Sequence, residues 1–185
     1  MSAAEFLALD APATAGWQLV DGQPRAMVPA SRTHGAVRAE LGRLIGNHLA
    51  ARGGACSVVT SPGIVPRVHA RHNVRYPDLA VTCVGYQAEE QTVSDPVLIV
   101  EMLSPTNAAQ TWANVWTYTT IPSVHEVLVV HTAAMAAELL RRLPDGTWPQ
   151  EPQSLDAAAT LRLESIALDL PLAALYRTTR LVLAG

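Results

Sequence analysis

The chain has 185 residues, of which 49% are apolar, so it is long enough to bury a full core without disulfide or metal staples. We therefore expect one domain over residues 1–185. The longest apolar runs are much shorter than the roughly 20 residues that cross a bilayer, which argues against a membrane protein. The formal net charge is only −3, and all thirteen basic residues are arginine, so lysine chemistry is excluded.

Charge is distributed unevenly along the sequence. Between Gly22 and Pro77, eight arginines and four of the six histidines accompany a single acid, Glu40. Such a basic segment in an acidic chain indicates a face for a polyanion such as nucleic acid. The alternative is a set of solvated arginines balanced in three dimensions by acids from elsewhere, because the charge of a segment is not the charge of a surface patch.

The N-terminal region predicts a short helix followed by a hairpin. Ser2 can cap a helix over Ala3–Leu9. The dipeptide Asp21-Gly22 separates two strand-like stretches, Trp17–Val20 and Arg25–Val28, and is a strong signal for a tight hairpin turn. The first ten residues contain two acids and no basic residue, so we do not expect a signal peptide.

The longest helix is predicted over Arg32–Ala51, and Gly53-Gly54 ends it. Six residues of this segment recur at helical spacing and are expected on one face: Val37, Leu41, Leu44, Ile45, His48 and Leu49. A strand is expected at Ala55–Thr60.

The C-terminal half alternates strands with one further helix. Strands are expected at Pro77–Val84, Val97–Leu103, Glu126–His131, Ala136–Arg142 and Thr160–Leu163. A helix is expected at Asn107–Thr120 and a last helical turn at Pro171–Tyr176. This order of elements predicts an α/β protein in which a mixed β-sheet is flanked by helices.

The most informative feature is an acid inside a buried strand. Glu101 is the only polar residue of VLIVEML, and Asp78 follows Pro77 at the start of the second apolar run, LAVTCV. An unpaired carboxylate inside a core strand costs several kcal/mol, so it must be protonated, paired or bound to a cation. Two such acids on neighbouring strands suit a divalent metal. Alternatively, Asp78 caps a turn and Glu101 pairs with an arginine such as Arg75.

Five stretches of the sequence resemble a known family: WQLVDGQ, PASRTHG, RYPDLAVT, VEMLSP and VWTYTTIPS. They are similar to the Uma-two family of restriction endonucleases, within the PD-(D/E)xK nuclease superfamily. The resemblance runs from about Phe6 to Arg177, and its specific part lies between Tyr76 and Ser123. It implies a restriction-endonuclease-like fold and a metal-dependent nuclease that hydrolyses DNA phosphodiester bonds.

The resemblance implies that Asp78 and Glu101 hold Mg²⁺ or Mn²⁺, on adjacent strands and with carboxylates within about 5–6 Å of each other. The predicted catalytic set is Asp78, Glu101, Asn114 and Gln18. The two amides can orient water or phosphate oxygens, but neither supplies charge.

The sequence departs from the family pattern around this site. The superfamily's plain lysine position is Leu103, and the family's displaced lysine aligns with Asn114. Amides also stand where the family often carries acids, at Gln110 and Gln18. Losing one charge-stabilising group typically costs about 10²–10³ in rate, so we expect any nuclease activity to be weak.

Other candidate residues have two interpretations each. His34 stands where the family often has a histidine, but it is expected as a core or capping residue. Arg32 and Arg75 either contact phosphate or are surface or ion-pair residues. The spacing of Cys56, Cys83, His69 and His72 matches no compact zinc site. Two cysteines are also too few for a disulfide framework, which favours a reducing, cytoplasmic location.

Three aromatic residues lie along the second predicted helix: Trp112, Trp116 and Tyr118. The spacing of the tryptophans favours core packing or a homodimer contact over base stacking. Two functions therefore remain: a weak metal-dependent endonuclease, or a catalytically inactive descendant that keeps the fold as a nucleic-acid-binding or dimerising module.

Overall fold

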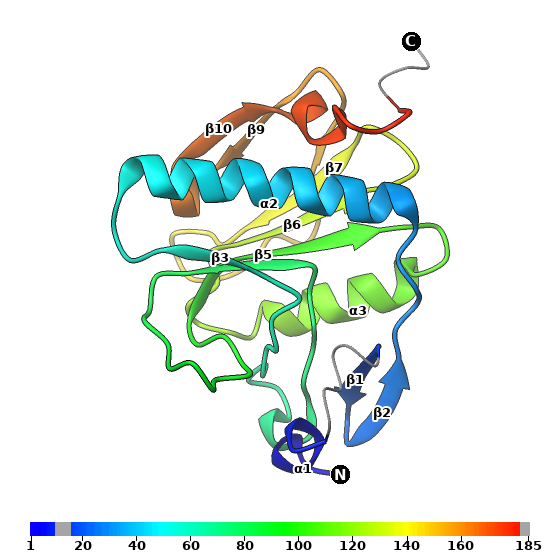
Figure 1. The fold of residues 1–185 in the computed structure, drawn as a ribbon, viewed down its shortest axis with the longest axis vertical. Helices are drawn as coiled ribbons and strands as arrows, with labels where there is room; N and C mark the ends of the chain where they lie inside the picture. The colour runs from blue at the N-terminus through cyan, green and yellow to red at the C-terminus, as the bar shows by residue number, and fades with distance from the viewer. Residues whose placement is uncertain (10–15, 182–185) are drawn as a thin grey trace.

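A six-stranded mixed sheet forms the centre of the protein (Figure 1). The computed structural model describes residues 1–9 and 16–181. The strands lie in the order β3 (Ser57–Thr60), β4 (Leu79–Thr82), β5 (Pro96–Leu103), β6 (Glu126–His131), β7 (Ala137–Arg141) and β8 (Gln153–Leu155). Of these neighbours only β5 and β6 pair in parallel. The predicted mixed sheet is confirmed.

The sheet is covered by one long helix on each face (Figure 1). Helix α2 (Arg32–Arg52) packs on one face, and α3 (Ala108–Tyr118) packs on the other as the crossover between the parallel strands β5 and β6. Alternate residues of β5 serve the two faces: Leu98, Val100 and Met102 join the α2 core, and Ile99 and Leu103 join the α3 core. By this alternation Glu101 points toward α3.

A small hairpin unit lies on the α3 side of the sheet, at the bottom of the view (Figure 1). It consists of α1 (Ala3–Leu7), β1 (Trp17–Val20), β2 (Gln23–Ala26) and η1 (Ala70–His72). Ser2 caps α1, as predicted, and forms a capping box with Glu5; the helix ends at Leu7, two residues before the predicted end. Asp21 and Gly22 both have positive φ, so the hairpin has a two-residue turn and β2 begins at Gln23, two residues before the predicted strand.

A second ribbon completes the core on the α2 side. It contains β9 (Thr160–Leu163), η2 (Glu164–Ile166), β10 (Leu168–Pro171) and η3 (Leu172–Tyr176), whose apolar side chains join the α2 core. The strands β8 and β10 were not predicted. β8 has only three residues, too few to show a period, whereas β10 alternates buried and exposed residues as β9 does and was overlooked. No helix within the described residues is long and apolar enough to cross a membrane.

The two cysteines form a disulfide, Cys56–Cys83. They flank the Ser57–Thr82 pair of the antiparallel strands β3 and β4, so the sheet register places them opposite each other. This pairing removes the cysteine argument for a reducing compartment, and the cytoplasmic location stays a prediction. It also removes both thiols as zinc ligands.

Candidate active site

Sheet pairing brings Asp78 opposite Glu101. β4 begins immediately after Asp78 and pairs antiparallel with β5, with Leu79 opposite Val100. The next pair in this register is Asp78 and Glu101. The Asp78 side chain is buried, and its Oδ2 accepts a hydrogen bond of 2.8 Å from the backbone N–H of Met102. This bond fixes the carboxylate across the two strands, so the alternative in which Asp78 caps a turn is wrong.

Glu101 is buried among neutral donors. Its Oε1 accepts a 2.8 Å hydrogen bond from the hydroxyl of Tyr118 and a longer one, 3.4 Å, from Nδ2 of Asn114. Burial raises the pKa of Glu101 to about 8, and the nearby charge of Asp78 adds to this increase. Within the described residues no arginine lies at ion-pair distance from Glu101, so the predicted alternative of an Arg75–Glu101 pair is not formed.

One face of α3 forms a neutral wall beside Glu101. Gln110, Asn114 and Tyr118 are spaced four residues apart and therefore align along the helix. Nε2 of Gln110 donates to Oδ1 of Asn114 at 3.1 Å, and Nδ2 of Asn114 lies 3.4 Å from Oε1 of Gln18 on β1. Burial and the adjacent Glu101 raise the pKa of Tyr118, which keeps its hydroxyl protonated as a donor.

The first turns of α2 form a second wall, beside Asp78. Ser31 caps this helix by accepting a hydrogen bond from the backbone N–H of His34. The His34 ring then reaches Asp78, with Nε2 2.5 Å from Oδ1, and Nη1 of Arg38, one turn further along the helix, lies 3.5 Å from the same oxygen. Nη1 of Arg38 also donates to Oγ of Ser61 at 3.3 Å.

These walls enclose a cleft of about 630 Å³. All four residues of the predicted set, Asp78, Glu101, Asn114 and Gln18, line it. The structure thus brings together side chains from β1, from the residue before β4, from β5 and from α3, which are the four residues predicted from the sequence. Their proposed roles in catalysis stay predictions.

Three residues of the site were missed or misinterpreted. His34 was expected in the core or at a cap, but its ring contacts Asp78. Tyr118 was grouped with two tryptophans, but its hydroxyl bonds Glu101. Arg38 was counted only within the basic segment. The available signal was helical spacing, because His34 with Arg38, and Asn114 with Tyr118, stand four residues apart.

The basic segment does not form one free surface. Arg43 pairs with Glu40, Arg52 donates to the carbonyl of Ile166, and Arg75 is buried and donates to the carbonyl of Leu19. These three guanidinium groups therefore hold the fold together. Arg75 fits neither interpretation offered from the sequence, whereas Arg32 is exposed.

The chemistry of the donors in this cleft fits a hard divalent cation. Residues 1–9 and 16–181 contain no cluster of three or more His, Cys, Asp and Glu side chains placed to hold a metal. Mg²⁺ is usually held by only one or two carboxylates, with water and phosphate oxygens completing its shell. Asp78 and Glu101 supply two carboxylates. Within the described residues Glu101 forms no ion pair, and the charge of the buried Arg75 lowers its pKa only as a minor effect against burial.

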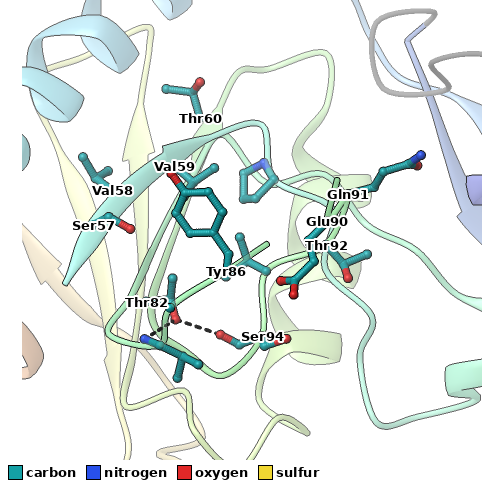
Figure 2. Close-up of a pocket in the computed structure, with 14 residues that line it drawn as sticks. Ser57, Val58, Val59, Thr60, Thr82, Tyr86, Glu90, Gln91, Thr92 and Ser94 are labelled. Atoms are coloured by element: carbon teal, nitrogen blue, oxygen red, sulfur yellow. Dashed lines mark hydrogen bonds between the residues drawn. The ribbon is translucent and has the colours of Figure 1, made fainter. Parts of the chain in front are cut away.

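A second cleft, of about 400 Å³, lies between β3 and the loop over residues 84–94 (Figure 2). Figure 2 shows Tyr86 and Glu90 among its lining side chains. Among the described residues that line it, Glu90 is the one acid, there is no arginine or histidine, and none belongs to the predicted site. The candidate active site is therefore the first cleft.

The fold and the site define a mixed α/β protein with two strand-borne carboxylates in a cleft between two helices. The Uma2 family model, described as "Putative restriction endonuclease", matches residues 3–174, and the chain belongs to this family. A solved structure from Anabaena variabilis ATCC 29413, described as a "putative nuclease belonging to DUF820", has a similar fold. The TM-score is 0.76 at 15% identity, over 96% of this chain and 98% of that one. No curated protein is significantly similar in sequence.

Proposed function

We propose that this protein is a Mg²⁺- or Mn²⁺-dependent endonuclease that hydrolyses DNA phosphodiester bonds through Asp78 and Glu101. The observation that carries the proposal is the placement of these two buried carboxylates opposite each other in a cleft, with only neutral donors on Glu101. A buried acid without a counter-charge is costly unless a cation completes the site. The family and the similar solved structure, both described as nucleases, support the reaction class.

Asp78 and Glu101 would hold the ion. A bound ion of this kind would act as a Lewis acid that polarises the phosphate, and it would lower the pKa of an attacking water. The protein's own groups orient these acids. The Met102 N–H and His34 hold Asp78, while Tyr118 and Asn114 hold Glu101. The amides of the cleft can orient water or phosphate oxygens, but they cannot neutralise charge. We therefore expect slow cleavage.

The alternative is a catalytically inactive nuclease fold that binds nucleic acid or dimerises. The neutral wall of α3 favours it, because Asn114 and Gln110 offer no cation to the phosphate. A homodimer is part of this alternative, and Trp116, which is 42% exposed on α3, is its candidate contact. Analytical ultracentrifugation of wild type and Trp116→Ala tests the dimer.

The test of the main proposal combines metal binding with cleavage. We expect Mn²⁺ to raise the thermal unfolding midpoint, because a ligand of the native state stabilises it by mass action. Glu101→Gln should abolish this shift and the slow nicking of supercoiled plasmid DNA. Glu138→Gln is the matched control, since Glu138 lies on β7 of the same sheet, pairs with His131 and is outside the cleft. An unchanged Mn²⁺ shift in Glu101→Gln would place the ion elsewhere, and a shift without nicking would favour the alternative.

A further inference from the structure

The two walls of the cleft differ in charge. The α3 wall presents the amides of Gln110 and Asn114 and the neutral Tyr118. The α2 wall presents His34 and Arg38, and Arg38 is the one arginine of the described residues that line the cleft. The N-terminal end of α2, which carries the positive end of the helix dipole, belongs to the same wall through His34. An anionic ligand is therefore attracted to one side of the cleft.

The Arg38 guanidinium is oriented by contacts to one of its nitrogens, and its other N–H donors are not used by these contacts. Its Nη1 atom donates to Ser61 Oγ at 3.3 Å and lies 3.5 Å from Asp78 Oδ1, which is longer than a good hydrogen bond. The side chain keeps 34% of its surface exposed. A guanidinium carries five N–H donors in a fixed fork, so donors remain for a ligand in the cleft.

The backbone of Ser61 supports this arrangement. Ser61 follows β3 with φ +47°, a left-handed conformation that is uncommon outside glycine and asparagine, and its N–H bonds the carbonyl of Asp78 at 3.0 Å. Such conformations persist where the surroundings hold them and are concentrated at functional sites. Here the conformation belongs to the residue that accepts the hydrogen bond from Arg38.

We propose that Arg38 is the phosphate-binding cation of this site, and that the scissile phosphodiester docks against the α2 wall, between Arg38 and the carboxylate pair. The inference rests on the proposed nuclease function. Asp78, and Glu101 when it is ionised, repel an incoming phosphate, and an arginine offsets this repulsion with a permanent charge and a fork that matches phosphate oxygens. Arg75 cannot take this role, because it is buried and its Nη1 donates to the Leu19 carbonyl.

The test uses Arg38→Gln and Arg38→Lys in the full chain, with Arg162→Gln as the matched loss of charge. Arg162 lies on β9, is 65% exposed and pairs with Asp169 outside the cleft. The first readout is the affinity for a fluorescein-labelled 20-base-pair DNA duplex in EDTA as NaCl is varied. The second is the Mn²⁺ shift of the thermal midpoint, and the third is the nicking rate in Mn²⁺.

Arg38→Gln should weaken duplex binding, reduce the slope of log affinity against log salt by about one, and slow nicking by about 10²-fold, with the Mn²⁺ shift retained. Arg38→Lys should keep the salt slope, and Arg162→Gln should match wild type. A wild-type salt slope and nicking rate in Arg38→Gln would overturn the role of Arg38 while leaving the nuclease intact. Failure of the wild type to bind the duplex would also overturn it. Loss of salt slope in Arg38→Gln, in a protein that neither binds Mn²⁺ nor nicks DNA, would support Arg38 and refute the nuclease.

Discussion

Two glutamates buried on adjacent parallel strands have opposite surroundings. Glu126, at the start of β6, is fully buried. Its carboxylate accepts hydrogen bonds from Nε of Arg141 at 2.9 Å, from the backbone N–H groups of Glu164 and Ser165, and from the hydroxyl of Ser165. Glu101, near the end of β5, accepts hydrogen bonds from Tyr118 and Asn114 alone among the described residues, both at the same oxygen. One carboxylate is neutralised by the fold, and the other faces a cleft together with Asp78.

The difference separates an acid that builds the structure from one that is available for a ligand. A third buried glutamate, Glu40 on α2, belongs with Glu126, because Arg43 and Arg177 both donate to it. These hydrogen bonds lower the pKa of Glu40 to about 2, whereas burial raises that of Glu101 to about 8. Burial of an acid is therefore not in itself a sign of function; burial without neutralisation is.

The largest expected effect comes from adding a charge to the neutral wall. Asn114→Lys places an ammonium beside Glu101 and the cleft, and we expect nicking of plasmid DNA in Mn²⁺ to rise about 10²-fold. Ala113→Lys adds the same charge to the exposed side of α3 and should leave the nicking rate at its wild-type value. No gain from Asn114→Lys in a protein that binds Mn²⁺ would mean that helix position 114 does not face the phosphate.

The second effect tests Glu126 as a structural acid. Glu126→Gln replaces one accepting oxygen by an amide that donates, so at least one of the four donors around it loses its partner. We expect a loss of about 2 kcal/mol in the free energy of unfolding, measured by urea denaturation followed by tryptophan fluorescence. An unchanged midpoint would show that Arg141 and η2 reorganise without cost.

The same substitution should act differently on the neighbouring strand. Glu101→Gln keeps a carbonyl oxygen for Tyr118 and Asn114 and removes a carboxyl group whose ionised form is disfavoured by burial and has no ion-pair partner within the described residues. We expect the metal-free protein to be equally stable or more stable, by up to about 1 kcal/mol in the same urea experiment. A clear destabilisation would mean that Glu101 is as fully paired as Glu126, and the comparison between the two acids would fail.

The smallest effect concerns pH and Glu40. Its pKa is lowered from 4.5 to about 2 by Arg43 first and then Arg177, so its contribution is fully present above pH 4.5 and is lost as the pH falls through 2. Both guanidinium groups are half-exposed, which screens the interaction, so we expect about 1 kcal/mol. Glu40→Gln should therefore lower the unfolding free energy at pH 7, and this difference from wild type should shrink steadily between pH 4.5 and pH 2. Parallel pH profiles for the two proteins would rule this contribution out.

Much of the fold was accessible from local patterns. The hairpin turn at Asp21-Gly22, the long helix from Arg32 and the strand carrying Glu101 each follow from short-range chemistry: a turn that requires positive φ, helical spacing after a serine cap, and a continuous apolar run. The three-residue strand β8 did not, because it is too brief to show a period and is identified only by its pairing with β7. β10 was overlooked although it alternates and pairs with the preceding strand β9.

The sequence by itself determined where the acids stand: Asp78 directly before one core strand and Glu101 within the next, since a carboxylate in an apolar run is visible without a structure. Only the tertiary structure decided what surrounds them. His34 and Asp78 are 44 positions apart, and Gln18 and Asn114 are 96 apart. These contacts form because one particular face of α2 and one of α3 pack on the sheet. The packing of the whole core determines which faces these are, and no local sequence pattern does.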